Sequence, residues 1–167
     1  WLIYFFYFAT STTSAVWEPY LDIDGNGNLA CYYSDERQKA NGVLQALVYK
    51  SSTDGINWGK VTNVVAVPNR NDRPGMVTVT RMGNGKYMAV YEVVNKPSLE
   101  VNTAICYYKI SDDGINWNPV DLGKPILLED GTGCGSAPFV KWINAGGPNG
   151  MVVVVPKWQV DKNGLIK

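Results

Sequence analysis

An internal repeat constrains the fold of this chain more than any other feature. Residues 49–58 read YKSSTDGINW, and residues 108–117 read YKISDDGINW, 59 residues later. A segment that returns at a fixed distance indicates one structural unit built more than once. Both copies contain an Asp-Gly turn between runs rich in aromatic and β-branched residues, which is the pattern of a β-hairpin.

Glycine turns and proline steps recur with nearly the same spacing. The turn GNGN at residues 25–28 and the turn GNGK at residues 83–86 each precede an apolar run, and GPNG at residues 147–150 is a less regular third copy. An X-Pro step comes before each turn, at residues 18–19, 73–74 and 137–138. Proline suits the first residue of a strand because it cannot donate to the ladder, and Asn-Gly suits a tight hairpin. Each repeat is therefore predicted to contain four antiparallel strands.

Four antiparallel strands that return every 50 to 60 residues or so are typical of a propeller blade. We therefore predict an all-β fold, a partial β-propeller of about two and a half blades. The expected blades are residues 16–72 and 73–135, with a partial blade at 136–167. A two-sheet sandwich is the alternative, but it does not explain three separate elements repeated at one offset.

The first residues are interpreted as the remainder of a preceding strand. Residues 1–8 are apolar and aromatic, and no basic residue precedes them. The run is too short to span a membrane, which needs roughly 20 residues, and it lacks the charged start of a signal peptide. We expect residues 1–15 to belong to a blade upstream and the chain to continue downstream of Lys167.

Composition narrows the chemistry available to the chain. Fifteen basic and fifteen acidic residues leave no net charge, so neither nucleic acid nor a membrane surface is expected as a partner. Histidine is absent, which removes Ser-His and Cys-His nucleophile pairs and the commonest ligand of transition metals. We predict no cofactor and no metal site, and catalysis must rely on carboxylates, Tyr, Lys or Arg.

The three cysteines give no sign of a metal site or a disulfide framework. Cys31, Cys106 and Cys134 are far apart in sequence and form no C-x-x-C pattern. Buried free thiols are the default interpretation. One disulfide with one remaining thiol is the alternative.

Two glutamates are the candidate catalytic residues. In an up-and-down blade the first strand starts on the face where the second strand ends. Glu18 starts a first strand and Glu92 ends a second strand, so both are expected at one mouth of the central channel. Paired carboxylates on a rigid rim beside aromatic residues suit the hydrolysis of a glycosidic bond. The alternative is that each is a rim charge paired with Arg73 or Arg37.

Substrate binding is expected on the same face. The predicted binding residues are Trp17, Tyr33, Asp35, Arg37, Arg73 and Tyr91. The aromatic rings can stack on sugars, although core packing explains each of them as well. The charged run at residues 35–37 is also typical of a solvated loop. The Asp-Gly turns fall on the opposite face, where we expect a structural role.

These patterns resemble known families. The Asp-Gly turns are similar to the Asp-box of sialidase-type propellers, S-x-D-x-G-x-x-W, but are one residue shorter between Asp and Gly. A longer ordered set resembles glycoside hydrolase family 93, the exo-α-L-arabinanases: WEPY at 17–20, YYSDER at 32–37, RPGM at 73–76, YE at 91–92 and GGPNG at 146–150.

The resemblance implies a six-bladed, secreted and monomeric propeller, more than twice this length when complete. It implies release of arabinobiose from the ends of α-1,5-arabinan with retention of configuration, with Glu92 as nucleophile and Glu18 as acid/base. Retention requires the two carboxyl groups to be about 5 to 5.5 Å apart.

Two other functions remain open. A sialidase has this fold but holds its substrate carboxylate with three arginines and uses a tyrosine nucleophile. A carbohydrate-binding propeller uses the same rim residues without turnover. Binding without turnover survives Glu→Gln replacement, whereas hydrolysis does not.

Overall fold

The computed structural model describes residues 15–95, 104–161 and 165–167. The apolar run at residues 1–8, and almost all of the strand remainder predicted there, lie outside the described residues. Within the described ranges the regular structure consists of strands and one short 3₁₀ helix, η1 (Lys39–Asn41). No helix in this part of the chain is long and apolar enough to cross a membrane.

The first repeat forms a four-stranded antiparallel sheet in the order β1-β2-β3-β4. Its strands are β1 (Val16–Ile23), β2 (Leu29–Asp35), β3 (Ala46–Ser52) and β4 (Thr62–Val65). The β1–β2 hairpin closes where Asp24 Oδ1 accepts hydrogen bonds from the backbone N–H groups of Asn26 and Asn28, both at 2.9 Å. Gly27, with φ 81°, takes the left-handed conformation that this turn requires.

The second repeat forms an equivalent sheet in the order β5-β6-β7-β8. Its strands are β5 (Asp72–Arg81), β6 (Tyr87–Asn95), β7 (Ala104–Ser111) and β8 (Lys124–Pro125). Successive strands in the chain are neighbours in both sheets, so each is an up-and-down meander, as expected of a blade. The two copies of the sequence repeat thus form two sheets with the same strand order.

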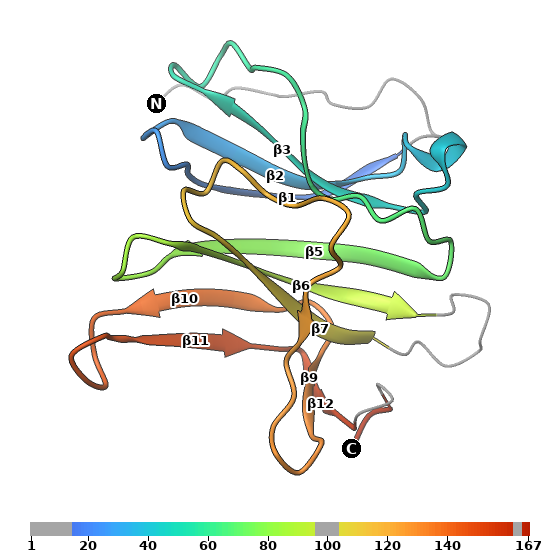
Figure 1. Ribbon diagram of the computed structural model, residues 1–167, viewed down its shortest axis with the longest axis vertical. Coiled ribbons are helices and arrows are strands. Elements are labelled where there is room, and N and C mark those ends of the chain that lie inside the picture. The colour runs from blue at the N-terminus through green and yellow to red at the C-terminus, as the bar shows by residue number, and fades with distance from the viewer. Residues whose placement is uncertain (1–14, 96–103, 162–164) are drawn as a thin grey trace.

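The third repeat contributes two pairs of strands. The predicted GPNG turn joins β10 (Phe139–Ile143) to β11 (Met151–Val155), which pair antiparallel. The pair β9 (Gly133–Gly135) and β12 (Trp158–Val160) is also antiparallel, although its strands fall on either side of the predicted blade boundary at residue 135. Figure 1 shows the first sheet, the second sheet and the β10–β11 pair stacked in sequence along the long axis of the molecule.

The two Asp-Gly turns have the same hydrogen bonds in both sheets. Asp54 Oδ1 accepts the N–H groups of Ile56 and Asn57 at 2.8 and 2.7 Å, and Asp113 Oδ1 accepts those of Ile115 and Asn116 at 2.9 and 2.8 Å. In each turn a serine hydroxyl also accepts the glycine N–H, at 2.9 Å. These contacts explain why the turn sequence repeats so closely.

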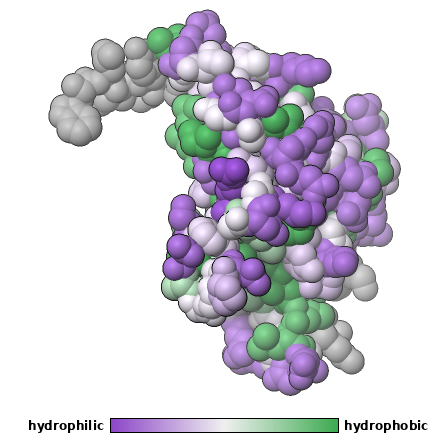
Figure 2. Space-filling model, turned by 60° about the vertical axis from the view of Figure 1, so that its left-hand side comes forward, coloured by the Kyte–Doolittle hydropathy of each residue, from purple (hydrophilic) through white to green (hydrophobic). Residues whose placement is uncertain are grey.

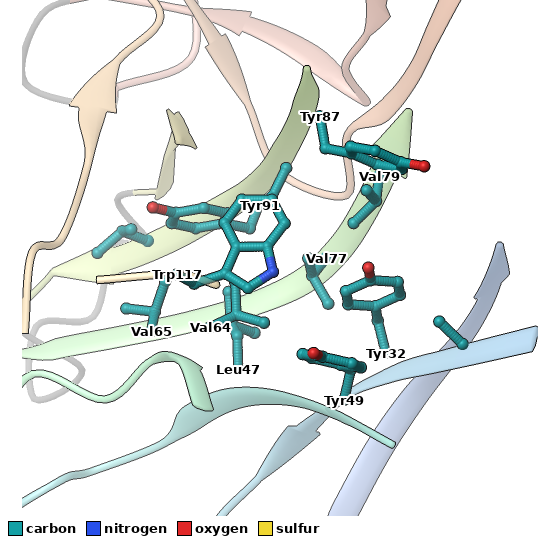
Figure 3. Packing of buried hydrophobic residues seen from close by; sticks show 13 residues of the cluster. Tyr32, Leu47, Tyr49, Val64, Val65, Val77, Val79, Tyr87, Tyr91 and Trp117 are labelled. Atoms are coloured by element: carbon teal, nitrogen blue, oxygen red, sulfur yellow. The ribbon is translucent and has the colours of Figure 1, made fainter. Parts of the chain in front are cut away.

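Aromatic residues fill the space between the first two sheets. Tyr32, Tyr49, Tyr91 and Trp117 belong to one buried cluster with small apolar residues of both sheets, and their side chains converge in Figure 3. The rings of Tyr32 and Tyr49 lie 5.2 Å apart, centroid to centroid. The Tyr49 hydroxyl donates across to the carbonyl oxygen of Ile115 at 2.9 Å, so the core joins the sheets by both packing and hydrogen bonding.

All three cysteines are free thiols. Cys31 and Cys106 are buried, and burial raises their pKa to about 11 and about 12, respectively. Such thiols are inert at neutral pH, since the thiolate is the reactive form. They behave as small apolar core residues.

Candidate active site

Residues with strained backbone lie near the start of β1, of β5 and of β10, which begin the three repeats. In the described residues, the non-glycine residues with positive φ are Glu18 (59°), Met76 (56°), Ser136 (59°) and Ala137 (39°). The strand pairing slips between Trp17 and Tyr20 and again between Gly75 and Thr78, which marks a bulge in β1 and another in β5. Each such residue costs about 1–3 kcal/mol, and residues of this kind cluster at functional sites.

The bulge in β1 directs Glu18 toward the second sheet. Glu18 Oε2 accepts hydrogen bonds from the Ser34 hydroxyl at 3.0 Å and from the backbone N–H of Met76 at 2.8 Å. Ser34 is fully buried in β2, and Met76 lies in the bulge of β5. Glu18 as a residue is exposed, yet its carboxylate is held between two blades.

Glu92 is held in the same way, one blade further on. It lies in β6 and is 8% exposed. Its Oε2 accepts a hydrogen bond from the backbone N–H of Ala137 at 2.9 Å. Each glutamate therefore takes an N–H from the strained segment of the next repeat, and a hydrogen bond of this kind fixes where a carboxylate points.

The two carboxylates face a common point beside Gly75. Gly75 is paired with Glu92 across β5 and β6. A Cβ atom on Gly75 would lie 3.5 Å from Glu18 Oε2 and 3.7 Å from Glu92 Oε1. These two oxygens are therefore at most about 7 Å apart, an upper bound that is compatible with the carboxylate separation of retaining glycosidases.

The predicted binding residues Asp35 and Arg37 engage each other. Arg37 Nη2 lies 2.5 Å from Asp35 Oδ2, and Arg37 Nε donates to Asp35 Oδ1 at 2.8 Å. The hydrogen bonds from Arg37 to Asp35 raise the pKa of the guanidinium. Arg37 also donates to the Tyr33 hydroxyl at 3.3 Å. These hydrogen bonds hold the three side chains together at the end of β2.

Arg73 forms a second ion pair nearby. Its Nη2 lies 3.3 Å from Glu36 Oε1, and Glu36 Oε2 lies 2.6 Å from Lys39 Nζ. Arg73 is thus paired with Glu36, a neighbour of the predicted binding residues, and the structure records no ion pair between Arg73 and Glu18 or Glu92.

The predicted aromatic residues separate into one exposed and two buried rings. Trp17 precedes Glu18 and is 48% exposed, so its ring is available to a ligand. Tyr33 and Tyr91 are 1% and 0% exposed, respectively, and Tyr91 donates to the carbonyl oxygen of Leu122 at 2.5 Å. A ring without exposed surface cannot stack on a sugar. The burial of Tyr33 and Tyr91 therefore argues against the stacking role that the sequence suggested for them.

Sequence reasoning did not single out the partners of the two glutamates. Gln45, just before β3, is 1% exposed and donates from Nε2 to the carbonyl oxygen of Pro74 at 2.6 Å. Ser34 appeared in the sequence only as part of the YYSDER motif at residues 32–37. The N–H groups of Met76 and Ala137 carry no side-chain signal, although the adjacent proline steps marked their location.

Within the described residues no group of three or more His, Cys, Asp or Glu side chains is placed to hold a metal ion.

Comparison with solved structures identifies the kind of propeller. The arabinobiose complex of Penicillium chrysogenum α-L-arabinanase matches with a TM-score of 0.76 and 37% sequence identity, over 86% of this chain and 40% of that chain. The arabinobiose complex of the GH93 α-L-arabinofuranosidase of Fusarium graminearum matches with a TM-score of 0.71 and 33% identity, over the same shares. The chain belongs with the GH93 propellers. The ordered motifs of the sequence had indicated this family.

The GH93 relationship covers most of this chain but less than half of its relatives. The chain spans 40% of the length of the solved structures that it matches. An endo-arabinase from Bacteroides thetaiotaomicron also matches, with a TM-score of 0.53 and 13% identity, which shows a shared fold alone. No protein-family model matches the chain, and no curated protein matches it either.

Proposed function

We propose that the protein carrying this chain is a retaining glycoside hydrolase that acts on α-1,5-L-arabinan from the chain end and releases arabinobiose. The observation that supports the proposal is the convergence of Glu18 Oε2 and Glu92 Oε1 on one point beside Gly75. The substrate class is supported by two GH93-type relatives solved with arabinobiose.

Burial favours Glu92 as the nucleophile. Its side chain is nearly buried, and the Ala137 N–H holds Oε2 so that Oε1 faces the space beside Gly75. A nucleophile must be held at a fixed distance from the carbon that it attacks. In the first step Glu92 Oε1 forms a bond to the anomeric carbon while the bond from that carbon to the glycosidic oxygen breaks.

Exposure favours Glu18 as the acid/base. In the first step its carboxyl group gives a proton to the departing glycosidic oxygen, so that the shortened arabinan leaves as an alcohol. In the second step Glu18 removes a proton from a water molecule, which attacks the anomeric carbon and releases Glu92. Because Glu18 is exposed, water can reach it for this step, and the proton that it takes restores the acid form for the next turnover.

The arginines and tyrosines weigh against a sialidase. Arg37 is paired with Asp35 and Arg73 with Glu36, so neither guanidinium is committed to a substrate carboxylate. Tyr33 and Tyr91 are buried, and burial raises the pKa of both hydroxyl groups. A buried tyrosine that resists ionisation is a poor nucleophile.

The test is sugar release from debranched arabinan by the full-length protein, with Glu92→Gln and Glu18→Gln as variants. We expect arabinobiose from the parent and a loss of several orders of magnitude in both variants. NMR of the first-formed product should show the α-anomer, as retention requires. The β-anomer would replace the retaining mechanism by an inverting one, whereas binding without release in all three proteins would indicate a carbohydrate-binding propeller.

We also propose that the protein acts outside the cell, because a polysaccharide of the plant cell wall is too large and too polar to cross a membrane. Detection of the activity in the culture medium of the source cells, with little in washed cells, would support this location. The reverse distribution would contradict it.

A further inference from the structure

The space between the two carboxylates exists because residue 75 has no side chain. Three polar atoms surround the position that a Cβ would take there: Gln45 Nε2 at 3.1 Å, Glu18 Oε2 at 3.5 Å and Glu92 Oε1 at 3.7 Å. They come from the loop before β3, from β1 and from β6. Three separate elements thus direct polar groups at one empty point.

The backbone does not explain why this residue is glycine. Gly75 is not among the residues with positive φ, while the next residue, Met76, adopts a φ of 56° with a full side chain. An L-residue at position 75 is therefore compatible with the backbone. The bulge in β5 does not require glycine here, so the absence of a side chain has another cause.

Packing also leaves room for a methyl group. Separations of 3.5 and 3.7 Å from the carboxylate oxygens are ordinary van der Waals contacts, and the contact of 3.1 Å with Gln45 Nε2 requires a shift of a few tenths of an ångström. An alanine would thus be tolerated by the fold, but its methyl group would occupy the point that both carboxylates face.

Gln45 borders the same space as the two glutamates. Its Nε2 is held by the carbonyl oxygen of Pro74 at 2.6 Å, so the amide is tied to the residue just before Gly75. Its buried Oε1 has no hydrogen-bond partner in the part of the chain that the structure describes. A buried acceptor left unpaired in a core costs stability, and this is expected where position matters more than stability.

We propose that Gly75 keeps open the space in which the reacting glycosidic bond lies, and that Gln45 sets its depth as a positioning residue. This inference rests on the proposed function. The occupant is the anomeric carbon of a neutral furanose with its glycosidic oxygen, which must lie between the nucleophile and the acid/base. A side chain at residue 75 separates that bond from both glutamates.

The first experiment compares Gly75→Ala with the parent, as full-length proteins, in arabinobiose release from linear arabinan. We expect kcat/KM to fall by about 100-fold or more, because displacing the reacting bond by about 1 Å already has an effect of this size. The melting temperature should change little. The matched control is Gly59→Ala, since Gly59 lacks positive φ and a Cβ there meets only Ser51 O, at 3.4 Å. Gly59→Ala should keep full activity.

A double variant separates blocked space from a displaced Gln45. In Gly75→Ala/Gln45→Ala the contact of 3.1 Å is removed, while the new methyl group still faces both glutamates. We expect the double variant to remain as inactive as Gly75→Ala. Recovery of activity would show that the single variant acted by pushing Gln45, and would overturn the role of Gly75.

Gln45→Met tests the positioning role. It removes the hydrogen bond to Pro74 and keeps the volume of the side chain. We expect kcat to fall about tenfold with KM little changed, which is the pattern of an interaction made in the transition state. An unchanged kcat would leave Gln45 as a core residue only.

Binding of arabino-oligosaccharides, measured by calorimetry, distinguishes failure of this inference from failure of the proposed function. If the parent cleaves arabinan and Gly75→Ala cleaves it equally well, only the inference is overturned. If the parent binds but never cleaves, the proposed function is wrong and no bond reacts beside Gly75, so the inference is overturned with it; loss of binding in Gly75→Ala would then show only that a sugar occupies this space. A parent that neither binds nor cleaves overturns both.

Discussion

At the scale of single residues, the site depends on where hydrogen-bond donors meet carboxylate oxygens. Glu18 Oε2 has two donors, Ser34 and Met76, and Glu92 Oε2 has one, Ala137. Two of these donors are backbone N–H groups, which only proline lacks, and the positive φ of Met76 and Ala137 excludes proline. Only Ser34 can therefore be tested by a simple replacement.

Ser34→Ala should lower kcat/KM for arabinan about tenfold. The variant removes one hydrogen bond of 3.0 Å to Glu18 and leaves the Met76 N–H in place, so the carboxylate is less well oriented but not lost. A net hydrogen bond to a charged group is worth about 1.5 kcal/mol or more, which corresponds to a tenfold effect or larger. Ser51→Ala on β3 is the control. Equal activity of parent and Ser34→Ala would exclude an orienting role for this hydroxyl.

Asp113→Ala should make the protein less stable at neutral pH and flatten its response to acid. Hydrogen bonds from the backbone N–H groups of Asn116 and Ile115 hold the pKa of Asp113 below its usual value of 3.8. A carboxyl group whose pKa is depressed on folding stabilises the protein above its unfolded pKa and loses this contribution as pH falls.

Urea unfolding from pH 7 to pH 2 measures this contribution. The stability difference between parent and Asp113→Ala should be constant above about pH 4 and shrink below it. Asp112→Ala is the control, because the ion pair of Asp112 with Lys86 is exposed and contributes little. A difference that does not vary with pH would contradict the assignment.

At the scale of elements, a buried lysine joins the first two sheets. Lys109 in β7 is 5% exposed. Its ammonium donates to the carbonyl oxygens of Val64 in β4 at 3.1 Å, of Asp121 at 2.7 Å and of Asn118. Burial lowers the pKa of Lys109, yet three carbonyl acceptors compensate the buried charge. The bond to Val64 adds a hydrogen bond between the two sheets to the one from Tyr49 to Ile115.

Lys109→Met should destabilise the protein by about 3 kcal/mol, because the buried carbonyl group of Val64 and two partly buried carbonyl groups lose a charged donor. The measurement is the free energy of unfolding in urea, and the exposed Lys60→Met is the control, expected to change it by less than about 0.5 kcal/mol. If the two variants are equally stable, the ammonium does not hold the sheets together.

At the scale of the whole molecule, apolar side chains are exposed on the first sheet and on the β10–β11 pair. In the β10–β11 pair, Phe139 and Val155 lie opposite each other and are 48% and 56% exposed. On the first sheet, Leu21 in β1 is 55% exposed. Figure 2 shows hydrophobic atoms on the surface, including at the lower end of the molecule. Exposed apolar sheet faces favour association with another surface.

The 167-residue chain alone should therefore self-associate, and Phe139→Lys/Val155→Glu should reduce this. The two new side chains lie on paired positions, where opposite charges are compatible with the sheet. Light scattering after size exclusion should show a concentration-dependent mass for the parent and a smaller one for the variant. Lys124→Glu, an exposed charge change elsewhere, is the control. A parent that stays monomeric at all concentrations would show that these faces are not adhesive.

Much of the fold could be predicted because its signals are local. The Asp-Gly and Gly-Asn-Gly turns, the proline steps and the alternation of apolar residues each act within a few residues, so the sequence indicated two four-stranded units and the hairpin of a third. The same signals placed Glu18 near the start of β1, where the structure has it, but they ended the second strand at Glu92, whereas β6 continues to Asn95. The family followed from the order of these motifs.

The contacts of the site were decided by tertiary structure. The hydrogen bond between Met76 and Glu18 joins residues 58 positions apart in the chain, and the one between Gln45 and Pro74 joins residues 29 apart. No local sequence pattern indicates which segments will face each other when one blade packs on the next. The burial of Tyr33 and Tyr91 could not be predicted either, because an aromatic residue near a strand end suits a core and a binding surface equally well. The sequence by itself determined the repeat, the strands and the two glutamates. Only the packing of one blade on the next brought their carboxylates to one empty point beside Gly75, because that convergence depends on distances between elements that are remote in the chain.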